Sequence, residues 1–174
     1  MDPKKGKDQG KFSRSDAATR RDRLQKKGEA KPGKIVAWRH GGAEFWGVDE
    51  NTIGTRVIES AFTIHRELGS GLLESVYERV LAELLIESGL KVQRQVPVPI
   101  RFRHLVFDEG FRADLIVEDL VVLELKSVEA ISAVHRKQIQ TYLRLTNLRL
   151  GYLLNFGAAL MKDGIVRAVN GLPE

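Results

Sequence analysis

The stretch from Asp114 to Lys126 reads DLIVEDLVVLELK and places acids and a lysine in and beside two short apolar runs. Residues 115–117 and 121–125 are rich in the branched side chains that β-strands favour. Residues 118–120 between them are polar at two of three positions and predict a tight turn. The stretch therefore predicts a β-hairpin.

The length of the turn fixes which residues of the hairpin face each other. If the loop has three residues, Val117 lies opposite Val121, and the same register places Asp114 opposite Glu124. Facing side chains on adjacent strands lie about 5 Å apart at Cβ. Side chains alternate between the faces of a strand, so Lys126 shares a face with Glu124. We therefore expect a cluster of two acids and a lysine.

Such a cluster favours metal-dependent chemistry. Two close carboxylates repel each other, so that one takes up a proton or a cation occupies the space between them. Mg²⁺ is commonly held by one or two carboxylates and completes its shell with water and phosphate. Lys126 could orient or deprotonate an attacking water, or neutralise charge on a phosphate. The pattern suits phosphodiester hydrolysis.

A solvent-exposed sheet face with accidental spacing is the simpler alternative. The residues around Glu124 are apolar on both faces of the strand, which predicts a strand covered on both sides. An ionised group in such a strand is expensive without a partner. This context favours the functional interpretation.

Two predicted helices flank the hairpin along the chain. Residues 72–88 have helical apolar spacing, with Glu74 in the first turn, where an acid also complements the helix dipole. Residues 132–147 form the second predicted helix, in which Gln138 and Tyr142 share one face. This pair could reach a substrate phosphate or base, or simply lie at the rim of the core.

The other predicted elements complete an α/β pattern. An earlier helix, capped by Asn51 or Thr52, is expected to run to Leu68. The remaining predictions are strands at 92–102, 107–117, 150–156 and 165–169, and turns at 108–110 and 163–164.

The order of these elements resembles the PD-(D/E)XK nuclease superfamily: a helix with an acid, a strand with an acid, a strand with acid-x-lysine, and a helix with the QxxxY pattern. In addition, HRELGSGLLESVYE from His65 to Glu78 is similar to the signature of the GxxExxxR protein family, which is assigned to that superfamily. The resemblance covers roughly residues 50–172. It departs from the pattern at Ala113, where the motif has proline, and at Glu78, where the family name asks for arginine.

The resemblance implies a restriction-endonuclease-like α/β core, with a central mixed β-sheet flanked by helices in the order αβββαβ. It also implies Mg²⁺-dependent cleavage of nucleic acid, DNA in preference to RNA, with Mn²⁺ as a substitute. The implied site consists of metal ligands Glu74, Asp114 and Glu124, of which the last two are also catalytic, the catalytic lysine Lys126, and substrate-binding Gln138 and Tyr142.

The composition of the chain limits which classes of protein and which kinds of site remain possible. The chain has 174 residues, 43% of them hydrophobic, which fits one domain with a core. It has no cysteine, so thiolate metal sites and cysteine nucleophiles are excluded, and the reducing cytoplasm is the expected compartment. No signal peptide or membrane span is predicted, because no apolar run is long enough.

The net charge of +5 comes entirely from the N-terminal part of the chain. Residues 1–50 hold 13 Lys and Arg against 8 Asp and Glu, which leaves 15 of each in residues 51–174. We expect residues 1–47 to be a disordered basic extension and residues 48–174 to be the nuclease-like domain. A GTG codon can serve as an alternative start codon, and inside a longer reading frame it is translated as valine. We therefore hypothesise that native synthesis starts at Val48.

Two alternatives to a nuclease follow from the same residues. Carboxylates about 5 Å apart also suit a retaining glycosidase, although Lys126 and the lack of aromatic sugar platforms argue against it. The stronger alternative is a non-catalytic module that keeps the nuclease fold for binding nucleic acid or protein. The sequence keeps all four polar residues of the implied metal and catalytic site, namely Glu74, Asp114, Glu124 and Lys126. This argues against simple decay of the site.

Overall fold

The computed structural model describes residues 36–40 and 43–172, and the remaining residues lie outside that description. Strands β1 (Val36–His40) and β2 (Ala43–Gly47) form a two-stranded antiparallel sheet. This hairpin falls within residues 1–47, the segment for which disorder is expected from sequence. Most of that segment, residues 1–35, 41 and 42, lies outside the described residues.

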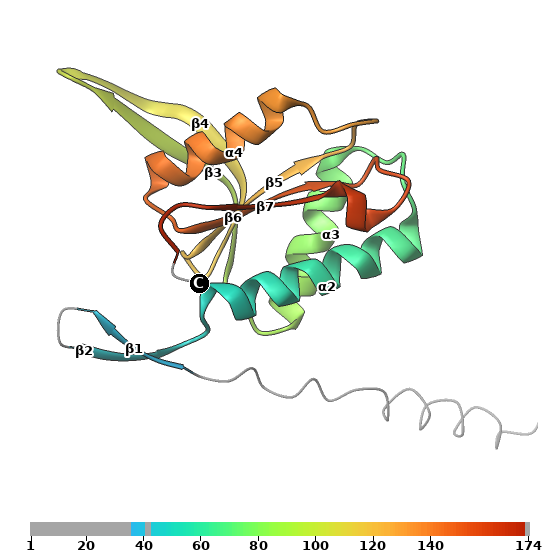
Figure 1. Cartoon of the computed structure of the whole chain (residues 1–174), viewed down its shortest axis with the longest axis horizontal. Coiled ribbons are helices and arrows are strands. Elements are labelled where there is room, and N and C mark those ends of the chain that lie inside the picture. Colours follow the sequence, from blue (N-terminus) through green and yellow to red (C-terminus); the bar gives the residue numbers. More distant parts are fainter. Residues whose placement is uncertain (1–35, 41–42, 173–174) are drawn as a thin grey trace, which may run out of the picture. The chain divides into compact units, whose positions relative to one another are not determined.

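A five-stranded mixed sheet forms the centre of the fold (Figure 1). Its strand order is β3-β4-β5-β6-β7, and only β5 and β6 pair in parallel. The strands span Val92–Phe102, Leu105–Val117, Val121–Lys126, Leu150–Asn155 and Ile165–Val169. The predicted mixed sheet and the order αβββαβ are confirmed.

Helices cover both faces of this sheet. Helices α2 (Glu50–Leu68) and α3 (Glu74–Glu87) pack on one face, where Val57 and Leu81 join Leu123 of β5 in the larger core cluster. Helix α4 (Ala133–Thr146) covers the other face, where Ile139 packs with Val122 of β5. Strand β5 is therefore buried on both sides, as its sequence predicts.

Helix ends agree with the sequence in one case and differ in another. The helix predicted over residues 132–147 is present as α4, which Ser132 caps at its start and Asn147, in the left-handed region, caps at its end. Helix α2 begins two to three residues earlier than expected, because Asp49 is its cap and accepts a hydrogen bond from the Thr52 N–H at 2.7 Å. The prediction of Asn51 or Thr52 as the cap is wrong.

The turn between β3 and β4 is also in a different place. The strands pair up to Phe102 and Leu105, so the chain reverses at Arg103, which has a φ of 54°, and His104. The predicted turn at residues 108–110 is wrong, since these residues lie inside β4. A Cβ on Gly110 would lie 2.1 Å from Cγ1 of Ile100, so this glycine permits a close cross-strand approach instead of a turn.

The final strands follow the prediction with a longer connection. β7 pairs antiparallel with β6, and the predicted turn residues 163–164 end a short 3₁₀ helix, η1 (Met161–Gly164). Across residues 36–40 and 43–172, no helix has both the length and the apolar character to cross a membrane.

Candidate active site

The β4–β5 hairpin has the predicted register. Val117 pairs with Val121, and Leu115 pairs with Leu123. Both Glu118 and Asp119 have positive φ, at 53° and 56°, as in the mirror-image turns that match the twist of hairpin strands. The three-residue loop thus fixes the alternation that puts Glu124 and Lys126 on the α4 face of β5.

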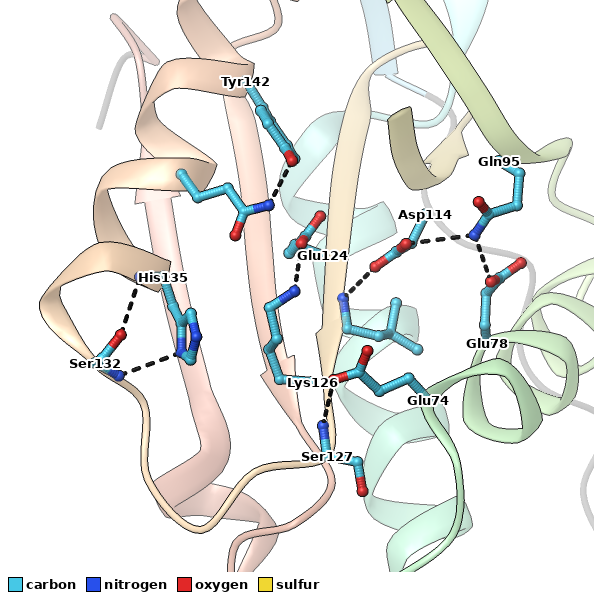
Figure 2. A network of polar contacts seen from close by, with 12 residues as sticks. Glu74, Glu78, Gln95, Asp114, Glu124, Lys126, Ser127, Ser132, His135 and Tyr142 are labelled. Atoms are coloured by element: carbon cyan, nitrogen blue, oxygen red, sulfur yellow. Dashed lines mark hydrogen bonds and ion pairs between the residues drawn. The ribbon is translucent and has the colours of Figure 1, made fainter. Parts of the chain in front are cut away.

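The two strands separate beyond Leu115 and Leu123, one position before the pair that would join Asp114 to Glu124. The Asp114 carboxylate fills the gap, because its Oδ2 accepts a hydrogen bond of 2.8 Å from the Leu125 N–H. Figure 2 shows this carboxylate against the main chain of β5. Asp114 is therefore held at the point where the ladder opens.

Glu124 is a buried acid with one free oxygen. Its side chain extends from β5 towards α4 and is only 4% exposed (Figure 2). Oε1 accepts a hydrogen bond of 2.6 Å from the Lys126 ammonium. Within the described part of the chain, Oε2 is buried and has no hydrogen-bond partner. Such an orphaned oxygen is costly unless a proton or a cation satisfies it.

The electrostatics agree with this view of Glu124. Burial, followed by the charge of Asp114, raises its pKa to about 7 despite the opposing Lys126 ammonium. Burial also raises the pKa of Asp114, against the lowering effects of the Leu125 N–H and the Lys126 charge. Both shifts mean that the site holds more negative charge than its surroundings stabilise, which is the condition that attracts a cation.

The pKa of Lys126 is also raised. Burial is the largest single influence and acts to lower it, but the hydrogen bond and charge of Glu124, with the charges of Glu74 and Asp114, outweigh burial. At neutral pH the lysine is therefore an ammonium group. This state suits charge neutralisation better than proton abstraction.

Glu74 lies near the pair without joining it. It is exposed in the first turn of α3, and its Oε1 accepts a hydrogen bond of 3.0 Å from the Ser127 N–H, just after β5. Its negative charge helps to raise the pKa of Glu124 and the pKa of Lys126. Among the described residues, no group of three or more acids or histidines is arranged to hold a metal ion. The structure brings Asp114 and Glu124 together and leaves Glu74 at the edge of the site.

Gln138 and Tyr142 lie beside the cluster on α4. The Gln138 amide donates a hydrogen bond of 2.5 Å to the Tyr142 hydroxyl. The Tyr142 ring stacks on Phe111 of β4 with centroids 3.8 Å apart. Burial, the largest influence, raises the pKa of Tyr142, and the charges of Glu124, Lys126 and Asp114 also act on it. Gln138 and Tyr142 therefore share one face of α4, as their spacing predicts, and the structure places this face beside the carboxylates.

A second polar network, not recognised from sequence, positions Asp114. Glu78 of α3 is 5% exposed and accepts hydrogen bonds from Arg94 at 2.8 Å and Gln95 at 2.6 Å. The Gln95 amide also donates to Asp114 at 3.4 Å, and Gln95 itself has a φ of 50° (Figure 2). Tyr77 and Glu78 face inward from α3 in the structure, which the apolar spacing of residues 72–88 does not predict.

The arginines of the domain do not all converge on the site. Arg94, Arg112 and Arg149 form ion pairs with Glu78, Glu109 and Glu50. Helix α4, by contrast, contains no acid, and its outer face has a surface hollow lined by Arg136, Lys137, Gln140, Thr141 and Arg144. This hollow lies on the outside of the helix whose inner side adjoins the carboxylates.

Comparisons with known proteins identify the family of the chain. The sequence matches no curated protein. Among solved structures, the crystal structure of SSO0001 is 19% identical, with 74% of this chain and 71% of that chain covered and a TM-score of 0.41. The model of the PD-(D/E)XK nuclease superfamily matches residues 51–168, which include every site residue described above. The chain belongs to the PD-(D/E)XK nuclease superfamily.

Proposed function

We propose that this protein is a Mg²⁺-dependent nuclease that hydrolyses phosphodiester bonds of nucleic acid, DNA in preference to RNA. The observation that carries the proposal is the buried, unpartnered Oε2 of Glu124, next to Asp114 and Lys126. A structural ion pair has no need of a second, buried oxygen without a partner. A metal ligand needs an oxygen that the cation can contact. Membership of the superfamily supplies the reaction class.

The residues present fit a hard divalent cation. Asp114 and Glu124 are the proposed ligands, and water would complete the shell because Mg²⁺ usually retains several waters. Glu74, bonded to the Ser127 N–H, is proposed to act through such a water. When bound, Mg²⁺ would polarise the phosphate and lower the pKa of a bound water. Mn²⁺ is the proposed substitute, because it prefers the same oxygen ligands.

The other side chains have separate roles. Lys126, as an ammonium, neutralises negative charge that builds on the phosphate oxygens. A cation at Glu124 Oε2 would leave Lys126 hydrogen-bonded to Oε1, next to the position of the substrate phosphate. Gln138 and Tyr142 are hydrogen-bonded to each other and would orient a substrate phosphate or base. The acid-free helix α4 would face the sugar-phosphate backbone with Arg136 and Arg144.

The finer assignment to the GxxExxxR family also remains a proposal. Gly71 and Glu74 match the pattern, and Glu78 stands where the pattern has arginine. In this chain Glu78 instead accepts hydrogen bonds from Arg94 and Gln95. An arginine at this position would face the same partners with the wrong charge. The side chain at this position therefore supports the site in a way that differs from the family pattern.

Cleavage assays test the proposed function. Purified full-length protein is incubated with single-stranded, duplex and branched DNA and with RNA, with Mg²⁺, with Mn²⁺ and with a chelator. We expect metal-dependent cleavage that Asp114→Asn, Glu124→Gln and Lys126→Ala each abolish. Glu83→Gln, which changes an exposed acid of α3, is the matched control and should cut like wild type. Cleavage that is indifferent to metal or to these substitutions would contradict the proposal.

One observation favours a non-catalytic binding module as the second candidate. The Asp114 carboxylate accepts hydrogen bonds from the Leu125 N–H and the Gln95 amide. The Lys126 ammonium donates a hydrogen bond to one oxygen of Glu124. A site arranged in this way could be a structural network on a nuclease fold. Nucleic-acid binding that persists without cleavage under every metal condition would favour this candidate.

A further inference from the structure

Strands β3 and β4 continue beyond the sheet as a two-stranded arm, defined here as residues 100–110. Every residue from 101 to 110 is exposed, and the two strands run on past helix α4 (Figure 1). None of residues 101–110 is buried, so their side chains are accessible to a binding partner.

One face of the arm is apolar along its length. Ile100 pairs with Phe107, and Phe102 pairs with Leu105, so these four side chains share a face by strand alternation. Phe102 is 59% exposed and Phe107 is 51% exposed. Contiguous exposed apolar side chains of this kind mark an interaction surface.

The tip of the arm is also positively charged. Residues 101–107 contain Arg101, Arg103 and His104 and no acid. The Arg103 guanidinium lies 5.4 Å from the centre of the Phe102 ring. Arg112, nearer the base of the arm, is neutralised by Glu109 at 2.6 Å. The excess positive charge is therefore concentrated at the end of the arm, next to the aromatic rings.

The base of the arm leads directly to the site. Phe111 pairs with Val98 in β3 and stacks on Tyr142 of α4. A register irregularity between Val98 and Ile100 separates the arm from the sheet. Such irregularities bend a ribbon and change its direction. At about 3.3 Å per residue, the eight residue-to-residue steps from Phe111 to Arg103 span about 26 Å, or about eight base pairs of duplex.

We propose that the arm binds unpaired bases of the nucleic-acid strand that flanks the cleaved phosphate, an inference that rests on the proposed function. Phe102 and Phe107 provide the faces on which bases stack, and Arg103, beside the Phe102 ring, contacts the adjacent phosphate. Arg101 lies on the opposite face by strand alternation and adds positive charge that attracts the strand. Aromatic rings interleaved with arginines are the arrangement that binds single strands without reading their sequence.

A second copy of the chain is the competing occupant of the apolar face. Two-fold pairing of identical tips through the apolar face would bring two tips together that each carry Arg103 and have no acid in residues 101–107 to offset the charge. Charged residues are depleted from the centres of protein interfaces. Charge complementarity thus favours a nucleic acid over a second copy.

The test compares two labelled DNA substrates of equal duplex length, a forked duplex with unpaired arms and a blunt duplex. Binding is measured by fluorescence anisotropy in a chelator, so that metal-dependent cleavage does not run. The Phe102→Ala/Phe107→Ala variant should bind the forked duplex at least about fivefold more weakly than wild type does. Its affinity for the blunt duplex should stay within about twofold of the wild-type affinity. Arg101→Ala/Arg103→Ala should lower the slope of log affinity against log salt by about 1 to 2. Leu160→Ala, which shortens an apolar residue that is 54% exposed outside the arm, is the matched control.

The outcomes separate this proposal from the nuclease proposal. Loss of fork binding in the arm variants supports the arm even if wild type cleaves nothing, in which case only the nuclease proposal fails. Unchanged fork binding in both arm variants, with wild-type cleavage intact, overturns the arm alone. Absence of nucleic-acid binding by wild type overturns the arm as well. If the phenylalanine variant instead changes the sedimentation of the free protein, the face is a self-association surface, and the proposal is also overturned.

Discussion

Replacement of Glu124 by glutamine should remove a pH dependence of stability that the buried acid imposes. The pKa of Glu124 is raised from 4.5 to about 7 in the folded protein, chiefly by burial and the Asp114 charge. Between these values the folded state holds more protons than the unfolded state. Stability contributed by the protonated acid is therefore present below pH 4.5 and is lost as the pH rises to about 7.

The size of this effect follows from the shift. At 1.36 kcal/mol per pKa unit, the change amounts to about 3 kcal/mol across the window. Because Glu124 is only 3% exposed, solvent screening reduces this figure little. Glutamine keeps the shape and an oxygen for the Lys126 ammonium, but it does not titrate. The free energy of unfolding of wild type should thus fall by about 3 kcal/mol relative to Glu124→Gln between pH 4.5 and pH 8.

The assay is urea unfolding of the full chain in a chelator at several pH values from 4.5 to 8. The readout is the difference between the two curves as a function of pH, since a constant offset between them carries no information on titration. Glu83→Gln controls for the loss of one exposed carboxylate. Parallel curves for wild type and Glu124→Gln would refute the view that Glu124 is a buried, under-compensated acid.

Three further predictions follow from other contacts. Gln95→Ala should weaken Mn²⁺ binding about tenfold in calorimetry, because the amide that links Asp114 to Glu78 is lost, and unchanged affinity would remove Gln95 from the site. Gly157→Ala should lower the unfolding free energy by about 1 to 3 kcal/mol in urea melts, because its Cβ would lie 2.4 Å from the Val128 carbonyl oxygen, and wild-type stability would contradict that packing. Metal affinity of wild type should rise from pH 6 to pH 8, because protons compete for Glu124, and a flat calorimetric profile would oppose this.

Local patterns predicted the elements that hold the site. The apolar run on both sides of Glu124 predicted a strand buried on two faces, and the turn length predicted the pairing of Val117 with Val121. Both inferences succeed because strand alternation and loop length are local properties of the chain. The spacing of Gln138 and Tyr142 placed them on one face of α4 for the same reason.

The features that were missed depend on tertiary contacts. The β4–β5 ladder ends at Leu115, and the neighbouring Asp114 is hydrogen-bonded to a network that runs through Gln95 to Glu78 of α3. The position of the β3–β4 turn was hidden because Arg103 adopts a positive φ that sequence rules assign to glycine or asparagine. Gly110 resembled a turn residue, although its role is to make room for Ile100.

Calorimetric titration of Mn²⁺ into the metal-free protein at pH 8 directly tests the proposal that Asp114 and Glu124 together hold a divalent cation. We predict that wild type binds one ion per chain and that both Asp114→Asn and Glu124→Gln lose this binding. Absence of binding by wild type, or binding that both variants retain, would contradict the claim.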